Sequence, residues 1–282
     1  MNHLEPDKTK EDMIRKITEV FQATNGNILS REGAVDPADA GAKIFEAPLI
    51  KFASANDGLW EEYHAPDVIG SWFMGPKEWL AGAETVICFF LPFSEYIRKD
   101  NYKAPEIVST AWLQSWKEGQ EFVLDFERAV VDMLEAEGSR CCAPTLDERY
   151  QSFMKELFSS NWSERHAAFA AGLGTFSLSK GMITERGIAG RFGSVITDRS
   201  IEPDQREYHD IYEYCINCGA CARRCPANAI SREYGKNHEI CNDYQVRKCA
   251  PYEPLCACGK CQTMVPCETG IPGKGRKYAE SL

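Results

Sequence analysis

The chain has 282 residues, of which 44% are apolar and 26% charged, enough to bury one large or two modest hydrophobic cores. This composition excludes a disordered linker and a disulfide-stapled miniprotein. The formal charge of -10 argues against tight binding of nucleic acid, because phosphate contacts supply most of that affinity. The amino terminus lacks an apolar signal segment, and no stretch reaches the ~20 apolar residues that span a bilayer. We therefore expect a cytoplasmic protein with no membrane contact and with reduced thiols.

Apolar periodicity predicts the first elements of the chain. Residues 12–21 repeat apolar side chains at helical spacing, which predicts a packing helix. Residues 45–75 are rich in Pro, Gly and aromatic side chains without a clear period, so irregular structure is expected there. Residues 84–92 form an apolar run closed by a proline, typical of a buried central strand. Residues 112–137 are amphipathic and predict a long helix that ends at Gly138.

The middle of the chain continues the alternation of strand and helix. Residues 140–144 are short enough for a second strand, and the succession strand, helix, strand indicates an α/β layer. Cys141 and Cys142 are interpreted as buried strand residues. Residues 162–171 predict another helix, and residues 191–197 predict a strand that is entered through glycine.

A glycine-spaced segment, residues 172–181, follows the helix at 162–171. A dinucleotide-binding loop would require a preceding strand and a glycine at position 177, which is Ser177, so that interpretation is disfavoured. The glycines either let the backbone approach a large flat ligand or only form turns, and the spacing does not decide between these. The polar residues 198–212 are interpreted as a linker. We therefore expect two domains, residues 1–206 and 207–282.

Cysteine is unevenly distributed, with ten of the thirteen residues lying between Cys215 and Cys267. The run from Cys215 to Cys225 has the spacing C-x2-C-x2-C-x3-C-P, which gives three thiolates to one 4Fe-4S cluster and the fourth to a second cluster. A tetrahedral zinc site typically uses two separated C-x2-C pairs, so iron–sulfur is strongly favoured over zinc. Basic residues within this module, including Arg223, Arg224 and Lys260, are expected to offset the negative charge of the clusters.

The crossed ligation of two-cluster ferredoxins then divides the cysteines between two clusters. The first set is Cys215, Cys218, Cys221 and Cys267. The second set is Cys225, Cys258, Cys261 and one further residue, for which we choose Cys241 over Cys249 and Cys256. Cys249 and Cys256 are then expected to be spare buried thiols.

The order of these motifs resembles the epoxyqueuosine reductase family, which is related in its core to the reductive dehalogenases. The likeness covers roughly residues 80–270 and is carried by residues 162–174, by residues 193–198 and by the cysteine run. It implies a nitroreductase-like, cobalamin-binding α/β (α+β) domain, followed by a ferredoxin-like domain whose two 4Fe-4S clusters feed electrons to cobalt. It also implies corrin contacts from two segments, namely Gly172, Leu173, Gly174, Thr175, Phe176, Ser177 and Ser179, then Arg191, Phe192, Gly193, Ser194 and Val195.

The chain departs from the family pattern in three places. Members that act on tRNA carry a catalytic Asp shortly before the Glu-Arg pair that begins at Glu164; ungapped counting reaches Phe158, and an insertion would give that place to Asp147. The second cysteine motif is C-x2-C-x5-C. The sequence also ends fifteen residues after Cys267, without the family's helical-repeat segment that helps to hold tRNA. We therefore expect a small-molecule substrate rather than nucleic acid.

The leading hypothesis is a cobalamin-dependent iron–sulfur reductase that receives electrons from an external donor such as a ferredoxin or flavodoxin. Asp147 is the predicted catalytic acid, and Tyr150, Glu185 and Arg186 are further candidates for proton donors or substrate clamps. Two alternatives stay open. The chain could be an electron-transfer protein without a corrin, or a reductase that binds flavin in the same cleft.

Overall fold

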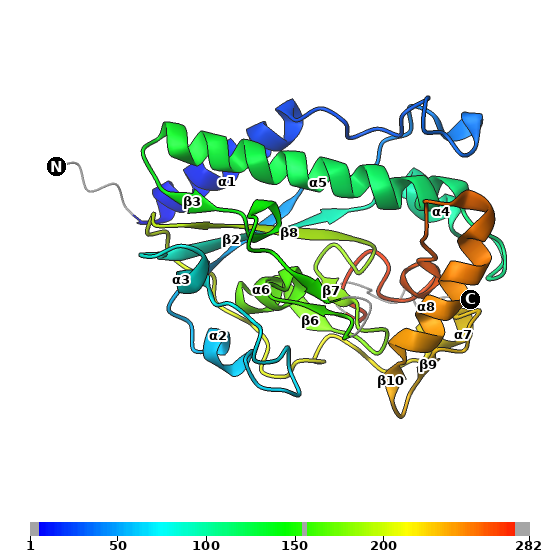
Figure 1. Ribbon diagram of the computed structural model, residues 1–282. Helices are drawn as coiled ribbons and strands as arrows, with labels where there is room; N and C mark the ends of the chain where they lie inside the picture. The colour runs from blue at the N-terminus through cyan, green and yellow to red at the C-terminus, as the bar shows by residue number, and fades with distance from the viewer. Residues whose placement is uncertain (1–5, 154–156, 274–282) are drawn as a thin grey trace, which may run out of the picture.

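A four-stranded antiparallel sheet lies at the centre of the computed structural model, which describes residues 6–153 and 157–273 (Figure 1). The strand order is β1-β2-β8-β3, formed by Leu49–Ser54, Thr85–Pro92, Gly190–Thr197 and Cys141–Cys142. Every residue of β2 is buried, as its unbroken apolar run predicts for a central strand with both faces covered.

The strands predicted at 84–92 and 191–197 are confirmed, and two expectations for the rest of the sheet need correction. Strand β1 lies inside the segment expected to be irregular, where Leu49–Ser54 pairs with β2. Strand β3 has only two residues and pairs with β8 rather than β2. Because β2 and β3 are both antiparallel to β8, they run parallel to each other, and the helix between them in the chain connects two parallel strands that lie on either side of β8. Cys141 and Cys142 are half-buried, because β3 is a short edge strand.

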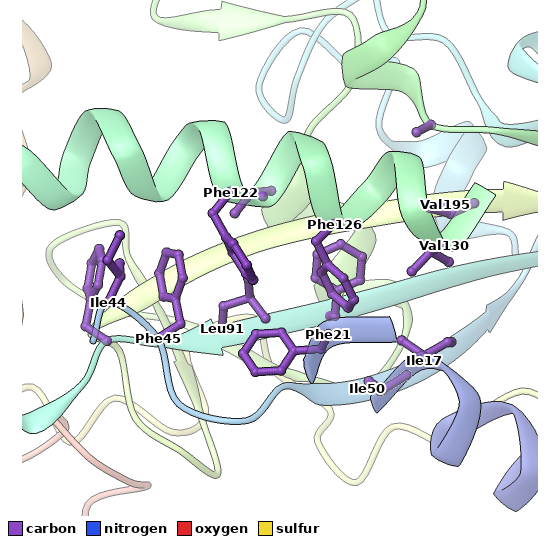
Figure 2. Packing of buried hydrophobic residues seen from close by; sticks show 14 of the residues in the cluster. Ile17, Phe21, Ile44, Phe45, Ile50, Leu91, Phe122, Phe126, Val130 and Val195 are labelled. Atoms are coloured by element: carbon purple, nitrogen blue, oxygen red, sulfur yellow. The ribbon is translucent and has the colours of Figure 1, made fainter. Parts of the chain in front are cut away.

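Two long helices, α1 (Pro6–Ala23) and α5 (Thr110–Ala136), cover one face of the sheet (Figure 1). Their apolar stripes confirm the helices predicted at 12–21 and 112–137. Phe122 and Phe126 of α5 point toward the sheet, and the ring of Phe21 from α1 packs edge-on against both at 5.5 Å (Figure 2). Burial of these aromatic side chains accounts for the position of α5, because large apolar side chains contribute most to a core.

The opposite face of the sheet is covered by short elements and by a stack of aromatic rings. Helix α6 (Glu164–Ala170) and the hairpin of β6 (Gly174–Phe176) and β7 (Met182–Thr184) lie on this side, with α2 (Leu59–Glu62) and α3 (Pro76–Trp79) beside them (Figure 1). The indole of Trp162, just before α6, stacks on Trp60 at 5.8 Å and on Phe73 at 5.9 Å. The remaining short elements before the cysteine-rich module are η1 (Pro37–Asp39), α4 (Glu95–Asp100), which lies beside α5, η2 (Pro144–Leu146), β4 (Ser152–Phe153) and β5 (Ser159–Ser160) (Figure 1).

The cysteine-rich module packs directly against this core. It contains α7 (Ala220–Arg224), β9 (Ile230–Ser231), β10 (Gly235–Lys236), α8 (His238–Cys249), η3 (Ala250–Tyr252) and η4 (Lys260–Gln262). Cys249 and Ala257 are buried in the same hydrophobic cluster as α5. The residues before the module, 198–212, carry no helix or strand, and Ile201 and Tyr208 attach this otherwise largely exposed polar segment to the core. The division at 206/207 stays a prediction.

No helix within residues 6–153 and 157–273 combines the length and the apolar character needed to cross a bilayer.

Candidate metal centres and active site

The first predicted ligand set surrounds one cavity. Cys215, Cys218, Cys221 and Cys267 all line a space of about 350 Å³, a volume that includes space open to solvent, although Cys267 lies far along the chain from the other three. The loop that carries the first cysteines turns through left-handed backbone at Asn217 (φ 47°) and Gly219 (φ 68°) before α7 begins. The hairpin of β6 and β7 forms the opposite wall, with Ser177, Leu178, Ser179 and Ile183.

The second predicted ligand set surrounds another cavity. Cys225, Cys241, Cys258 and Cys261 line a cleft of about 870 Å³, a volume that includes space open to solvent. Cys225 ends α7, Cys241 lies in the first half of α8, and Cys258 and Cys261 flank the left-handed Gly259. The other walls come from the part of the chain that forms the four-stranded sheet and its helices, and they include Phe93, Trp112, Trp116, Gly190 and Arg191.

Neither spare cysteine lines these two cavities. Cys249 is buried, and its thiol lies 3.6 Å from the carbonyl oxygen of Ala257. Cys256 is half-buried next to Cys249, and burial together with that neighbouring thiol raises the pKa of Cys256 to about 11. The geometry therefore separates Cys241 from Cys249 and Cys256, and the assignment of cysteines to two clusters stays a prediction.

The cysteines do not converge as the ligands of a single metal ion would. Among residues 6–153 and 157–273, no group of three or more His, Cys, Asp or Glu side chains is arranged to hold one ion. Four thiolates around zinc lie only about 4 Å from one another, because each Zn–S bond is about 2.3 Å long. A 4Fe-4S cluster places its iron atoms and sulfides between the thiolates, so donors spread around a cavity fit a cluster better than zinc.

A buried lysine adds positive charge to the second cavity. Lys260, between two predicted ligands, is only 2% exposed, and its Nζ donates to the carbonyl oxygens of Asn101 at 3.2 Å and Lys103 at 3.1 Å. No ion pair of Lys260 is found in the described part of the chain, and burial lowers its pKa to about 8. A buried cation without a paired carboxylate requires compensation, and a negatively charged cluster in this cavity would provide it.

We expect Lys260→Met to lower the reduction potential of the second cluster and leave the first unchanged. Removing a buried positive charge beside the cluster disfavours the added electron, by on the order of 1–2 kcal/mol at short range. Redox titration followed by electron paramagnetic resonance measures both clusters in one sample. The control is Lys117→Met, which changes an exposed lysine on α5. If the second cluster has the same potential in Lys260→Met and in Lys117→Met, the positive charge of Lys260 does not act on that cluster.

The residues predicted to contact a corrin divide between the two cavities and the closed core. Ser177 and Ser179 line the first cavity, and Arg191 lines the second. Arg191 donates to Gln120 Oε1 at 2.8 Å and to the carbonyl of Trp116, while its buried Nε has no partner in the described residues. Most of the remaining predicted contacts are buried in the protein, and these are Leu173, Gly174, Thr175, Phe176, Gly193, Ser194 and Val195.

The two glycines that begin the segment are explained by the chain's own packing. A Cβ on Gly174 would lie 2.0 Å from the carbonyl oxygen of Ile183 across the β6–β7 hairpin. Gly172 has a φ of +83° and a backbone neighbour, the carbonyl oxygen of Gln205, at 3.2 Å from a built Cβ. The turn and close-packing interpretation of the spacing therefore accounts for both positions without a ligand.

We expect Gly174→Ala to lower the free energy of unfolding by about 1–3 kcal/mol, the usual cost of forcing atoms into a packed interior. The clash is with backbone, which cannot rotate away. Gly58→Ala is the matched control, because Gly58 has ordinary helical backbone and open space where the methyl group would lie. Urea denaturation of both variants measures the difference, and equal stabilities would contradict the packing described for the hairpin.

Comparison with known proteins places these features in a known fold. Residues 208–231 match the 4Fe-4S binding domain family. The chain is 39% identical over 67 residues to the tetrachloroethene reductive dehalogenases of Desulfitobacterium hafniense and Dehalobacter restrictus, a match that covers 23% of this chain and 12% of the curated proteins.

Solved structures extend the likeness to most of the chain. A reductive dehalogenase described with a mechanism for B12-dependent dehalogenation superposes with a TM-score of 0.53 and 19% identity, over 82% of this chain and 31% of that protein. Epoxyqueuosine reductase with a modified tRNA-Tyr stem loop superposes with a TM-score of 0.54 and 17% identity, over 95% of this chain and 67% of that protein. The chain has the fold shared by reductive dehalogenases and epoxyqueuosine reductases. The expected fold class, with a ferredoxin-like part after an α/β (α+β) reductase layer, is therefore confirmed.

Within the reductive dehalogenase fold, Asp147 lies apart from both cysteine cavities. It follows η2 and forms an ion pair with Arg149 at 2.7 Å, which together with a further bond to the Arg149 backbone holds the pKa of Asp147 at about 2. Asp147 lines a shallow cavity with Cys141, Cys142 and Trp79. A carboxylate held ionised is a poor proton donor, so this environment does not favour the predicted role of Asp147, which stays a prediction.

Among the other candidate acids and clamps, Tyr150 lies beside Asp147, and its backbone N–H donates to the Asp147 carbonyl oxygen at 3.0 Å. Tyr150 is half-buried, and burial raises its pKa. Glu185 and Arg186 lie in the exposed turn that follows β7. Phe158, the position reached by ungapped counting, has left-handed backbone (φ 51°) and stacks on His238 at 5.3 Å.

A pair of buried carboxyl groups was not anticipated from the sequence. Glu127 of α5 is 0% exposed, and Glu164 of α6 buries both of its carboxyl oxygens. Burial raises the pKa of Glu127 well above its usual value, with the negative charge of Glu164 as the next cause, and burial raises the pKa of Glu164 to about 7. The reductive dehalogenase fold of this chain therefore contains carboxyl groups that hold protons near neutral pH.

Proposed function

We propose that the chain is an iron–sulfur reductase that passes electrons from an external low-potential donor through two 4Fe-4S clusters to a corrin, which reduces a small-molecule substrate. The observation that carries the proposal is the pair of cavities, each lined by four cysteines, on a fold shared with B12-dependent and epoxyqueuosine reductases. The first cluster is held by Cys215, Cys218, Cys221 and Cys267, and the second by Cys225, Cys241, Cys258 and Cys261.

The position of the cavities supports electron transfer between the module and the reductase layer. The first cavity lies near the surface, because Ile216 between two of its ligands is 57% exposed. The second cavity lies against α5 and β8 through Trp112, Trp116 and Arg191. Both cavities therefore border residues that the family resemblance assigns to the corrin.

The residues that would hold a corrin are those at the cavity walls. Ser177 and Ser179 offer hydroxyl groups, and the unpartnered Nε of Arg191 is a buried donor that requires an acceptor. The carboxamide side chains of a corrin provide such acceptors. A bound corrin would supply a low-potential cobalt centre for the bond-breaking chemistry, while the protein supplies position and electrostatics.

An electron-transfer protein without a corrin is the second candidate. It is favoured by the closed packing of Gly174, Thr175 and Ser194, each buried among the chain's own atoms where the resemblance expects contacts to a large cofactor. The two candidates share the clusters and differ in whether the reductase layer binds cobalamin.

Reconstitution without oxygen tests the proposal. The purified chain is supplied with iron, sulfide and cobalamin, and then separated by gel filtration. The proposal expects about eight iron atoms per chain, retained cobalamin with a shifted corrin spectrum, and reduction of the cobalt by a reduced ferredoxin or flavodoxin. Clusters without retained cobalamin would favour the electron-transfer protein, bound flavin would favour a flavin reductase, and the absence of iron would contradict both proposals that include clusters.

A further inference from the structure

The buried carboxyl groups of Glu127 and Glu164 meet at one residue of strand β8. The backbone N–H of Ser194 donates to Glu127 Oε1 at 3.2 Å, and the indole N–H of Trp162 donates to the Ser194 hydroxyl at 3.0 Å. Glu127 also accepts a short hydrogen bond from the hydroxyl of Thr145. Glu164 lies close enough to Ser194 and Trp162 for both to lower its pKa, but neither of its buried oxygens has a well-aligned hydrogen bond in the described residues.

No cation among the described residues neutralises this pair. Neither carboxyl group forms an ion pair within the described residues, and the positive charge that acts on Glu127 is Arg128, at the exposed surface of α5. The other titratable groups that face the pair are Tyr150 and the buried thiol of Cys88 on β2, and both are neutral at pH 7 because burial raises their pKa values. Two buried carboxylates without a cation cannot both be ionised, so the pair retains at least one proton at neutral pH.

The pair is connected to the second cluster cavity along β8. Arg191 lines that cavity, and Ser194 lies three residues further along the same strand, a distance of about 10 Å at 3.3 Å per residue. The cluster lies beyond Arg191, so its separation from the pair is of this order or larger, and one added electron at roughly 10–15 Å raises the proton affinity of a partly shielded carboxylate by about six- to sixteenfold. Because the pKa of Glu164 is about 7, a change of this size is enough to shift its protonation at neutral pH. Thr145, which is half-buried, joins Glu127 to the protein surface.

We propose that Glu127 and Glu164 form a redox-linked proton site, which binds one proton from solvent when an electron reaches the second cluster and releases it when that electron leaves for the substrate. This inference rests on the proposed function, because it needs the second cluster. In the first step a carboxylate of the pair becomes a carboxylic acid while the cluster gains one electron from the external donor. In the second step the electron leaves for the substrate and the carboxylic acid releases its proton to solvent by the same path past Thr145, so the pair is returned to its starting state.

Infrared difference spectroscopy on the full, reconstituted chain tests the site. The spectrum of the protein reduced with dithionite minus that of the oxidised protein, at pH 7, is expected to gain a C=O band of a protonated carboxyl group that shifts in D2O. Glu164→Gln is expected to abolish the band, and Glu127→Gln is expected to shift or weaken it. Glu118→Gln changes a carboxylate on the same helix that is bonded to Ser30 at the surface, and it should retain the band.

The potential of the second cluster provides an independent readout that a merely structural pair would not change. The wild-type potential is expected to fall as the pH rises from 6 to 8, and Glu164→Gln is expected to remove that dependence while the cluster signals persist. Two outcomes would overturn this inference and leave the proposed function intact. In the first, the second cluster is reduced but no carboxyl band appears. In the second, the band is retained in both Glu127→Gln and Glu164→Gln. If the wild-type protein binds no clusters on reconstitution, both the proposed function and the redox-linked proton site are overturned.

Discussion

Replacing Cys241 with Ser is expected to remove the second cluster and to lower the iron content from about eight atoms per chain to about four. Cys241 lines the second cavity with Cys225, Cys258 and Cys261, so its loss leaves that cluster with three thiolates. The first cavity has four other cysteines and should keep its cluster. Iron analysis and electron paramagnetic resonance of the reduced, reconstituted protein measure the change.

Two matched variants separate ligation from the loss of a thiol. Cys249→Ser and Cys256→Ser alter the neighbouring cysteines that do not line the second cavity, and both variants are expected to keep about eight iron atoms. Full iron content in Cys241→Ser with a loss in either control would show that the fourth ligand is one of these two residues.

Candidate cluster ligands can be recognised in a sequence where short spacings constrain the geometry of one loop. The run from Cys215 to Cys225 is local, so its ligand pattern is visible in the sequence. Cys241 and Cys267 are harder to assign from the sequence, because only the folded chain brings α8 and the last loop to the cavities. The choice of Cys241 depended on counting ligands, and the structure places it at the cavity while the alternative Cys249 is turned into the core.

Strand β1 and the glycine segment show where sequence patterns fail. The segment around Leu49–Ser54 contains several aromatic residues and prolines without a period, and its strand exists because β2 offers an unpaired edge. This is tertiary pairing, which local propensity does not report. Gly174 looked equally suited to a ligand or a turn, and only the carbonyl of Ile183 on the facing strand explains why a side chain is excluded.

The burial of Glu127 and Glu164 could not be predicted from the sequence for a different reason. A glutamate at the start of a helix, as Glu164 is in α6, is ordinarily a solvated residue that stabilises the helix dipole. Glu127 likewise belongs to a helix whose exposed face is rich in charged residues. Burial of both carboxyl groups follows from the packing of α5 and α6 against opposite faces of β8, a contact between three elements far apart in the sequence.

Replacing Glu164 with Gln is expected to change how stability depends on pH, by about 3 kcal/mol across the titration of this carboxyl group. Its pKa rises from 4.5 in the unfolded chain to about 7 in the fold, so the native state binds more protons between these values. The stability gained from the neutral group is fully present below pH 4.5 and is lost as the pH rises through 7. Each pKa unit corresponds to about 1.4 kcal/mol.

Glutamine keeps the shape of the neutral acid and cannot ionise, so the variant should gain stability relative to wild type as the pH rises from 5 to 8. Urea denaturation of both proteins at matched pH values measures this difference, in which the titration of distant groups such as Asp147 cancels because both proteins contain them. Glu127→Gln, which changes the other member of the pair, should show a pH-dependent difference of the same sign, because burial raises the pKa of Glu127 as well. A constant difference for Glu164→Gln would mean that Glu164 is ionised in the fold throughout this range, and that the pair does not hold the proton assigned to it.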